Sequence, residues 1–528
     1  MESPLPFFNS LGIDFGSSKT VYSKISITQS QIIEKVLDKI PSYITYLNDE
    51  IKIGKDSKDS TLQNINSTYT NLSKIFAKMK VPIYELENEF SIINKSEIEN
   101  PEKIVSDYLK KINDKLLKEE MNAITIAIPD YNTQIQKEIL HKILSKIGMK
   151  RLAVINESSA ITIYYGYKNY SELFNQDKNS EITPNYVEKE ILFIDAGNSK
   201  ISLITSKYTF LNFTVLNVIT LPSLGGRNFD QKIESYVIDK FRRENKLKVF
   251  NYTNEMRFRL IEEIKKKREE LSFVEEVEIK VTNFYNDLNL SVKLDRKKFE
   301  KCISELLNAF TETLNNLKNS LIRTGEKDEN GQNIFEKLNI SKIEMCGELM
   351  NTPILKNIVD KVFNFKVEKT LNPNDYISMG CSLMGLYFNK QFPKSYFQNF
   401  YHFNYYRICY SFGNKLEEKL TFINRGPVII WKRMIELPND DNIKIIIEYA
   451  KNEMNIEEKI EGREIMIYDI NCNQPNKKIC IYLRHDQKLI SEHLVDEENK
   501  RINGNISIKE FAENPYWIEI LNKLNKIN

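Results

Sequence analysis

Two distant segments of the chain share one pattern, in which an apolar stretch leads into an aspartate, a glycine and small polar residues. The segments are 11–20 (LGIDFGSSKT) and 191–200 (ILFIDAGNSK). An apolar run that ends in Asp, Gly and Ser predicts a strand followed by a tight turn. An apolar run resumes at 201–204 after the second turn, so we expect two β-hairpins in a duplicated architecture.

Other patterns predict helices and a second group of strands. Residues 126–131 read as a strand ending in Pro-Asp, followed by a helix over 134–148, and a further helix is expected over 259–271. Beyond residue 404 the period shortens to two, which is typical of strands in a β-sandwich. The alternating segments are 407–412, 428–437, 443–449, 465–469 and 478–484. Apolar residues at helical spacing predict a short helix within 506–528.

The two turns have the chemistry of phosphate loops. Gly16 lets the backbone approach a ligand closely, and Ser17 and Ser18 add hydrogen-bond donors. Asp14 is placed to reach a hydrated Mg²⁺ ion. The second turn offers the same set, with Asp195 followed by Gly197, Asn198 and Ser199. Two such hairpins predict a nucleotide held between two halves, each of which supplies one phosphate loop and one carboxylate.

Four further motifs accompany the turns in order along the chain. They are IAIPDY at 126–131, VINESSA at 154–160, LGGRNFD at 224–230 and NPND, followed by MGC, at 372–381. Together with the turns they resemble the actin-like ATPases and, within that superfamily, the 70-kDa heat-shock chaperone family, over roughly residues 10–390. The resemblance implies an α/β actin-like ATPase fold of duplicated ribonuclease H-like lobes, followed by a β-sandwich.

The resemblance also implies a set of site residues. The catalytic carboxylates would be Asp14, Glu157 and Asp195, and Asp14 and Asp195 would hold Mg²⁺ through water. The implied cofactor is ATP or ADP with Mg²⁺. Its binding residues would be Gly16, Ser17, Ser18, Gly197, Asn198, Ser199, Gly225, Gly226, Arg268, Ser272 and Gly347.

Local features are closer to the 110-kDa branch of that family than to its ATP-hydrolysing foldases. Arg227 follows the paired glycines where foldases have an acidic residue, and residues 70–76 are similar to that branch's A-N-L-K-R-I-I. No acidic-leucine linker follows residue 390. The implied role is a co-chaperone, which exchanges nucleotide on a partner foldase or holds unfolded polypeptides. That branch's acidic insertion and three-helix bundle have no counterpart here, so any exchange activity would run through the ATPase-like lobes.

Several departures argue against efficient hydrolysis. The family's catalytic lysine falls on Ser73, and positioned cations supply much of the stabilisation in phosphoryl transfer. A glycine and an arginine of the adenosine pocket are replaced by Glu348 and Asn351. We expect at most a weak ATPase. Three alternatives stay open, namely a hydrolysing foldase, a scaffold without nucleotide and, least favoured, a sugar kinase on the same fold.

Length and composition limit the number of domains and the kinds of partner. With 528 residues the chain is long enough for two or three domains. We expect an ATPase-like domain at 1–392, a linker at 393–404, a β-sandwich at 405–500 and a tail at 501–528. The net charge of +2 provides no field for nucleic acid or an anionic membrane.

Cysteine usage and the termini indicate a compartment. The six cysteines show no C-x-x-C spacing, and only four histidines are present, so a zinc site is not expected. Free thiols fit a reducing compartment. The sequence has no apolar signal-peptide core and no run of 18 apolar residues. These features predict a protein of the cytoplasm or nucleus that does not span a membrane.

Overall fold

The computed structural model describes residues 8–28, 32–48, 50–78, 101–116, 120–132, 134–174, 188–327 and 333–392, and from residue 399 onward only strands. The chain divides into two compact units. The first combines Met1–Phe76 with Leu86–Tyr401, and the second combines Ala77–Glu85 with His402–Asn528. Within the segment expected as a linker, residues Asn399–Asn404 form strand β17.

The first sheet of the first unit is built around the N-terminal hairpin. Its strands are β1 (Phe8–Phe15), β2 (Lys19–Ile27), β3 (Ile32–Pro41), β7 (Ala123–Ile128) and β8 (Leu152–Asn156). The order is β3-β2-β1-β7-β8, in which β1, β2 and β3 are antiparallel neighbours and β7 lies parallel to β1. The expected strand–turn–strand at 11–20 is therefore present, and the turn opens where β1 ends.

A second sheet repeats this arrangement. Strands β9 (Lys189–Ala196), β10 (Ile201–Tyr208) and β11 (Asn212–Leu221) are antiparallel, and β16 (Ile340–Cys346) lies parallel to β9. Residues Asn399–Tyr401 of β17 pair with β11. The order β11-β10-β9-β16 matches β3-β2-β1-β7 of the first sheet. The predicted duplication and actin-like fold class are confirmed.

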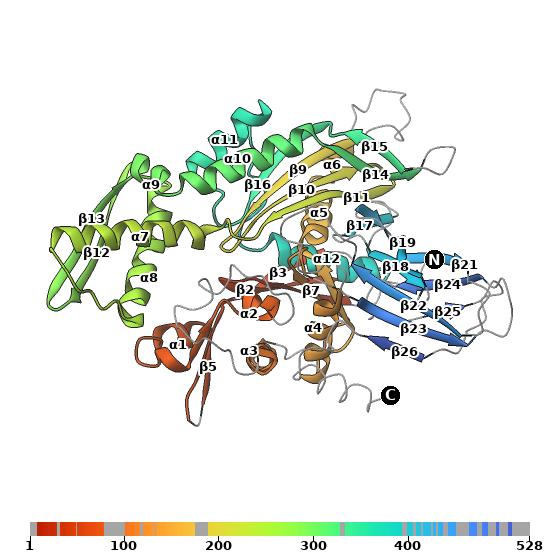
Figure 1. Cartoon of the computed structure of the whole chain (residues 1–528), viewed down its shortest axis with the longest axis horizontal. Helices are drawn as coiled ribbons and strands as arrows, with labels where there is room; N and C mark the ends of the chain where they lie inside the picture. Colours follow the sequence, from red (N-terminus) through yellow and green to blue (C-terminus); the bar gives the residue numbers. More distant parts are fainter. Residues whose placement is uncertain are drawn as a thin grey trace. The chain divides into compact units, whose positions relative to one another are not determined.

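Two buried helices lie between the sheets (Figure 1). They are α5 (Glu157–Lys168) and α12 (Tyr376–Phe388), which contact each other, and α12 also packs on β1. Small residues permit this close packing, because a Cβ on Gly380 would lie 2.0 Å from the Ala160 carbonyl oxygen. A Cβ on Gly12 of β1 would lie 1.8 Å from the Ser378 carbonyl oxygen. Backbone thus meets backbone at both contacts of α12.

The remaining elements of the first unit flank the two sheets. Beside the first sheet lie β4 (Tyr43–Tyr46), β5 (Ile51–Ile53), β6 (Thr68–Thr70), α1 (Gly54–Asp59), η1 (Ile65–Ser67), α2 (Leu72–Lys78), α3 (Pro101–Leu116) and α4 (Gln134–Lys146). Helix α6 (Tyr170–Phe174) lies beside the second sheet (Figure 1), because its Glu172 pairs with Lys342 of β16. Later in the chain come α7 (Gly226–Glu244), α8 (Asn254–Leu271), β12 (Glu276–Tyr285), β13 (Leu288–Asp295), α9 (Arg296–Cys302), α10 (Ser304–Asn319), β14 (Leu321–Lys327), β15 (Asn333–Lys337) and α11 (Pro353–Phe363). The helices expected at 134–148 and 259–271 correspond to α4 and α8. None of the helices described is both long and apolar enough to cross a membrane.

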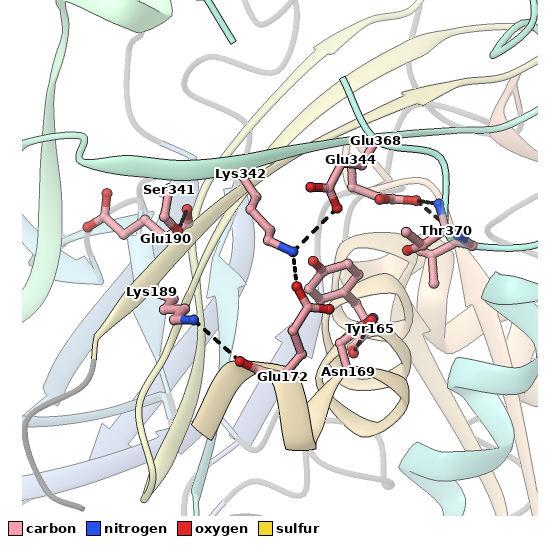
Figure 2. Close-up of polar contacts among 11 residues, drawn as sticks. Tyr165, Asn169, Glu172, Lys189, Glu190, Ser341, Lys342, Glu344, Glu368 and Thr370 are labelled. Atoms are coloured by element: carbon pink, nitrogen blue, oxygen red, sulfur yellow. Dashed lines mark hydrogen bonds and ion pairs between the residues drawn. The ribbon is translucent and has the colours of Figure 1, made fainter. Parts of the chain in front are cut away.

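Charged side chains at the outer edge of the second sheet anchor the chain that leads into α12 (Figure 2). Lys342 of β16 forms ion pairs with Glu172 of α6 and Glu368, the latter at 3.4 Å. The buried Glu344 accepts backbone hydrogen bonds from Thr370 and from Leu371, at 2.5 and 2.9 Å. Residues 370–371 come shortly before α12, so Glu344 of β16 holds the chain that leads into that helix.

The second unit contains the strands that alternation predicted. A five-stranded sheet has the order β19-β18-β22-β23-β26, a three-stranded sheet has the order β21-β24-β25, and residues 402–404 pair with β20. The bounds are β18 (Ile408–Phe412), β19 (Lys415–Ile423), β20 (Gly426–Val428), β21 (Trp431–Glu436), β22 (Asn442–Tyr449), β23 (Glu464–Asn471), β24 (Lys478–Leu483), β25 (His493–Val495) and β26 (Asn505–Ile508). Each of the five predicted segments overlaps one of these strands, and the segment 428–437 also includes the last residue of β20.

One strand overlaps the start of the segment in which a short helix was expected. The helix expected within 506–528 does not begin at Ile506, because Asn505–Ile508 form β26 and pair with β23. The sequence Asn-Ile-Ser-Ile alternates polar and apolar residues, and the edge of β23 offers backbone partners that a short helix would leave unused. The rest of the expected helix, 509–528, lies outside the described residues.

The contact between α5 and α12 yields a stability prediction. A Gly380→Ala substitution should lower the free energy of unfolding by about 3 kcal/mol, because the new methyl group forces two backbones apart. Gly148→Ala is the matched control, since a Cβ added there would have nothing within 4 Å and only the φ of +90° is unfavourable, a cost of about 1–2 kcal/mol. Thermal denaturation of both variants measures the difference. If the two substitutions lowered the midpoint equally, the result would contradict the close packing of α12 on α5.

Candidate functional site

A cleft of about 340 Å³ opens within the first unit, beside the turns of both hairpins. The first turn contributes Ser17 and Ser18 to its lining, the second contributes Asn198, and the loop after β16 contributes Glu348. Helices α7 and α8 contribute Arg227 and Lys265. Two segments about 180 residues apart in the sequence, both predicted as phosphate loops, therefore face the same space.

Backbone hydrogen bonds join the loops around the cleft. The Gly197 carbonyl accepts from the Gly226 N–H at 3.1 Å, and the Ala196 carbonyl accepts from the Leu349 N–H at 2.8 Å. The Asn198 side-chain amide donates to Ser17 Oγ at 3.4 Å, which links the second turn to the first. The half-buried Ser199 completes the second turn. The four loops that the sequence singled out converge in the structure.

Glycine is needed at two of these positions. A Cβ on Gly225 would lie 2.5 Å from the Asn198 carbonyl oxygen, so the third loop could not approach the second with any larger residue. Gly347 has φ +87°, and its Cβ would lie 2.4 Å from the Ala196 carbonyl oxygen. The predicted glycines thus serve to bring the loops together. Gly16, in the first turn, is similarly close to the Lys19 carbonyl.

The three predicted catalytic carboxylates lie near one another. Asp14 is near the end of β1, Glu157 is the first residue of α5, and Asp195 is near the end of β9. Loss of hydration raises the pKa of the half-buried Asp14 carboxyl to about 8, and the charges of Glu157 and Asp195 contribute to that rise. Residues from both halves of the duplicated fold therefore form one acidic group.

The sequence analysis missed a lysine within this group. The Nζ of Lys200 lies 2.5 Å from Glu157 Oε2 and 3.2 Å from Asp195 Oδ2, and it donates to Ser202 Oγ at 3.0 Å. Burial alone would lower the pKa of Lys200, but the carboxylates of Glu157 and Asp195 raise it above its usual value. The residue is 6% exposed and directly precedes the buried strand β10. The only signal in the sequence was the place of this lysine, five residues after Asp195 and directly before an apolar run.

A tyrosine completes the set. Tyr376, the first residue of α12, donates its hydroxyl hydrogen to Asp195 Oδ1 at 2.6 Å. Both carboxylate oxygens of Asp195 are therefore engaged, Oδ1 by Tyr376 and Oδ2 by Lys200. Tyr376 comes shortly after the segment that Glu344 holds through Thr370 and Leu371.

These contacts bear on the predicted Mg²⁺ site. Hydrated Mg²⁺ needs carboxylate oxygens that are free to accept hydrogen bonds from its water ligands. At Asp195 each oxygen already accepts one hydrogen bond, and the donor on Oδ2 is itself a cation that would repel a metal ion. Among the described residues there is no group of three or more His, Cys, Asp and Glu side chains arranged to hold a metal ion. The residues present do not fit a magnesium ion held by Asp14 and Asp195.

No lysine stands at the position expected for the family's catalytic one. Ser73 is half-buried in α2. The neighbouring Lys74 is buried, with its Nζ 3.3 Å from the Pro222 carbonyl oxygen and 5.7 Å from the ring centroid of Tyr131. The ammonium group of Lys74 is therefore engaged in contacts within the protein.

Two residues predicted to bind the nucleotide have structural partners. Arg268 of α8 is 5% exposed, and its Nε donates to Asp230 Oδ1 at 2.6 Å. Its guanidinium group also lies against Gly226, where a Cβ would be 3.0 Å away. The carbonyl of Ser272, the residue that follows α8, accepts from Arg296 at 3.2 Å. Neither Arg268 nor Ser272 lines the cleft as the structure describes it.

Side chains that line the cleft also contact one another beside Glu348, in the loop after β16. Glu348 Oε1 lies 3.3 Å from Lys19 Nζ, and Lys265 Nζ donates to Ser18 Oγ at 3.1 Å. Burial would raise the pKa of Glu348, but Lys265 and Lys19 hold it below its usual value. Asn351, at the position of the adenine-stacking arginine, is exposed and accepts from Lys369 at 3.3 Å.

Comparison with known proteins agrees with this architecture. A family model described as Hsp70 protein matches residues 10–392. The chain is 26% identical over 278 residues to heat shock 70 kDa protein 4L of Homo sapiens, covering 52% of this chain and 30% of that protein. It is 22% identical over 400 residues to heat shock protein 88 of Dictyostelium discoideum, covering 71% and 48%. It is 21% identical over 401 residues to a heat shock protein homolog of Lachancea kluyveri, covering 71% and 54%. The chain thus spans about a third to a half of the length of these relatives.

The Arg268–Asp230 pair can be tested as a structural element. Arg268→Met leaves Asp230 buried without its cation, and the free energy of unfolding should fall by about 3–5 kcal/mol. Lys232→Met is the matched control, because Lys232 and its partner Glu305 have side chains that are 42% and 79% exposed; it should cost no more than about 1 kcal/mol. Chemical denaturation of both variants measures the difference, and equal midpoints would contradict the structural role of Arg268.

Proposed function

Since the chain belongs to the Hsp70 family, we propose that it is a nucleotide-binding chaperone of the 110-kDa type, which acts as a co-chaperone. Its partners would be an Hsp70-type foldase, on which it accelerates nucleotide exchange, and unfolded polypeptides, which it holds. The observation that carries the nucleotide-binding part is the convergence of four glycine-containing loops from both halves of the fold on one cleft.

The donors around the cleft support an anionic ligand. Ser17, Ser18 and Asn198 present hydroxyl and amide groups at the ends of β1 and β9, and Lys19, Lys265 and Arg227 add positive charge. Backbone and side-chain donors at a turn form the concave sites in which proteins bind phosphate. The ligand of this proposal is ADP or ATP.

Three features support a co-chaperone in preference to a hydrolysing foldase. Ser73 replaces the family's catalytic lysine, and Lys200 pairs with Glu157, which would otherwise be available to orient water. The sequence after residue 390 lacks the acidic-leucine linker of the foldases. Among the relatives, heat shock 70 kDa protein 4L and the Lachancea kluyveri homolog belong to the 110-kDa branch. At most a weak ATPase activity is proposed.

The proposal extends to domain roles and to the compartment. Residues 1–392 would be the nucleotide-binding domain and 405–500 the β-sandwich that meets unfolded polypeptide, with 393–404 as the linker and 501–528 as a tail. The cytoplasm, or also the nucleus, would be the site of action. Neither a nucleic acid nor a membrane is among the proposed partners.

One observation favours a second candidate, a scaffold that works without nucleotide. The contacts of Lys19 with Glu348 and of Lys265 with Ser18 cross the cleft. A nucleotide would have to displace both contacts, and binding energy would be lost in doing so. If this candidate holds, the fold would serve only to present its surfaces to partner proteins.

Nucleotide affinity separates the two candidates. Isothermal titration of the full chain should show ADP binding with a dissociation constant below about 1 mM, or −4 kcal/mol. Glu348→Gly combined with Asn351→Arg should tighten binding about tenfold, because the substitution removes the contact to Lys19 and adds a guanidinium able to stack on adenine. The control is Glu120→Gly, at an exposed glutamate of a loop. Failure of both the natural chain and the double variant to bind would contradict nucleotide binding and favour the scaffold.

The co-chaperone role has a direct assay. The chain should accelerate release of labelled ADP from an Hsp70-type foldase, with a rate that saturates as its concentration rises. Absence of acceleration at molar excess would rule out exchange activity. Suppression of aggregation of a heat-unfolded client, measured by light scattering, tests the holdase role separately.

A further inference from the structure

The acidic group of Asp14, Glu157 and Asp195 carries its own cation. Glu157 and Asp195 are each no more than 5% exposed, and Asp14 is close enough to interact with both. A buried carboxylate is stable in the folded protein only when a partner compensates for its lost hydration. Lys200 is that partner, since its Nζ lies within 3.2 Å of oxygens of both Glu157 and Asp195.

Lys200 contacts one of the two carboxylates that the family resemblance assigns to a metal ion, Asp195. Its charge also acts on the other, Asp14, whose pKa it lowers against the rise caused by burial. Lys200 directly follows the second turn and already contacts Asp195 Oδ2, while Tyr376 occupies Oδ1. The ammonium group donates hydrogen bonds to Asp195 and Ser202 and forms an ion pair with Glu157. It therefore contacts an oxygen of each of three side chains, as expected of a structural site.

We propose that Lys200 replaces the divalent cation of this site, so that the turns at Asp14–Ser18 and Asp195–Ser199 bind nucleotide phosphates without Mg²⁺. The replacement of the metal depends on the contacts of Lys200 alone, whereas the binding of phosphates rests on the proposed nucleotide binding. Ser17, Ser18 and Asn198 would contact the phosphates directly, and the lysine would neutralise the carboxylates beneath them.

Metal binding tests the first part without nucleotide. Titration of Mn²⁺, followed by electron paramagnetic resonance, should show no site in the natural protein up to about 1 mM metal. Lys200→Met leaves the three carboxylates without a compensating cation. This variant should acquire one Mn²⁺ site with a dissociation constant at least tenfold below that limit of about 1 mM. Lys200→Arg keeps the charge and should behave as the natural protein does. A tight Mn²⁺ site in the natural protein would overturn the proposal.

Stability gives a second readout, which is needed because loss of Lys200 destabilises the fold. Addition of MgCl₂ should raise the melting temperature of Lys200→Met and leave that of the natural protein unchanged, with ionic strength matched by KCl. If Lys200→Met does not fold even with the metal present, the melting temperature of the natural protein with and without MgCl₂ tests the proposal by itself. A rise in its melting temperature with MgCl₂ would overturn the proposal.

A nucleotide titration then tests whether phosphates bind without Mg²⁺. ADP affinity of the natural protein should be the same within twofold in MgCl₂ and in EDTA, whereas a metal-dependent site would lose at least tenfold in EDTA. A tenfold loss in EDTA would contradict metal-free phosphate binding. Absence of ADP binding in both buffers would count against the proposed function, and the Mn²⁺ titration would still decide whether Lys200 replaces the metal.

Discussion

The ion pairs of Lys200 with Glu157 and Asp195 hold together the centre of the first unit. Glu157 begins the helix that follows the first sheet, whereas Asp195 lies near the end of the central hairpin strand of the second sheet. One ammonium group therefore connects the two halves of a duplicated fold at the point where their turns meet. Removal of one partner from a buried ion pair costs about 3–5 kcal/mol, because a charge is left without compensation. The arrangement of the two hairpin turns depends on this contact.

Close backbone packing makes the contact possible. Gly380 lets α12 lie against α5, and Gly12 lets the same helix lie against β1. Through these approaches Tyr376 at the start of α12 reaches Asp195, and Glu157 at the start of α5 reaches Lys200. The site is therefore built from helix starts and strand ends whose separation is set by residues without side chains. Larger residues at Gly12 or Gly380 would separate the elements and the charges together.

The cleft combines an intact backbone frame with altered side chains. The loops at Gly197, Gly225 and Gly347 contact one another through backbone hydrogen bonds, which depend little on side-chain identity. Glu348, Lys265 and Lys19 by contrast form contacts across the cleft that belong to this chain's own side chains. The backbone contacts that define the loops do not depend on the side chains that line the cleft, which is why the fold alone does not establish hydrolysis.

The sequence by itself determined the hairpins, the glycine loops, the order of motifs and the strands of the second unit, because these follow from local patterns of two to ten residues. Tertiary structure decided the rest. The partners of Lys200, Tyr376 and Arg268 lie up to 181 residues away, and no local pattern selects among so many acidic residues. The segment Asn505–Ile508 became a strand because an edge of β23 was available to pair with it. Charge compensation and sheet pairing are properties of the folded chain, since both need groups that only folding brings into contact.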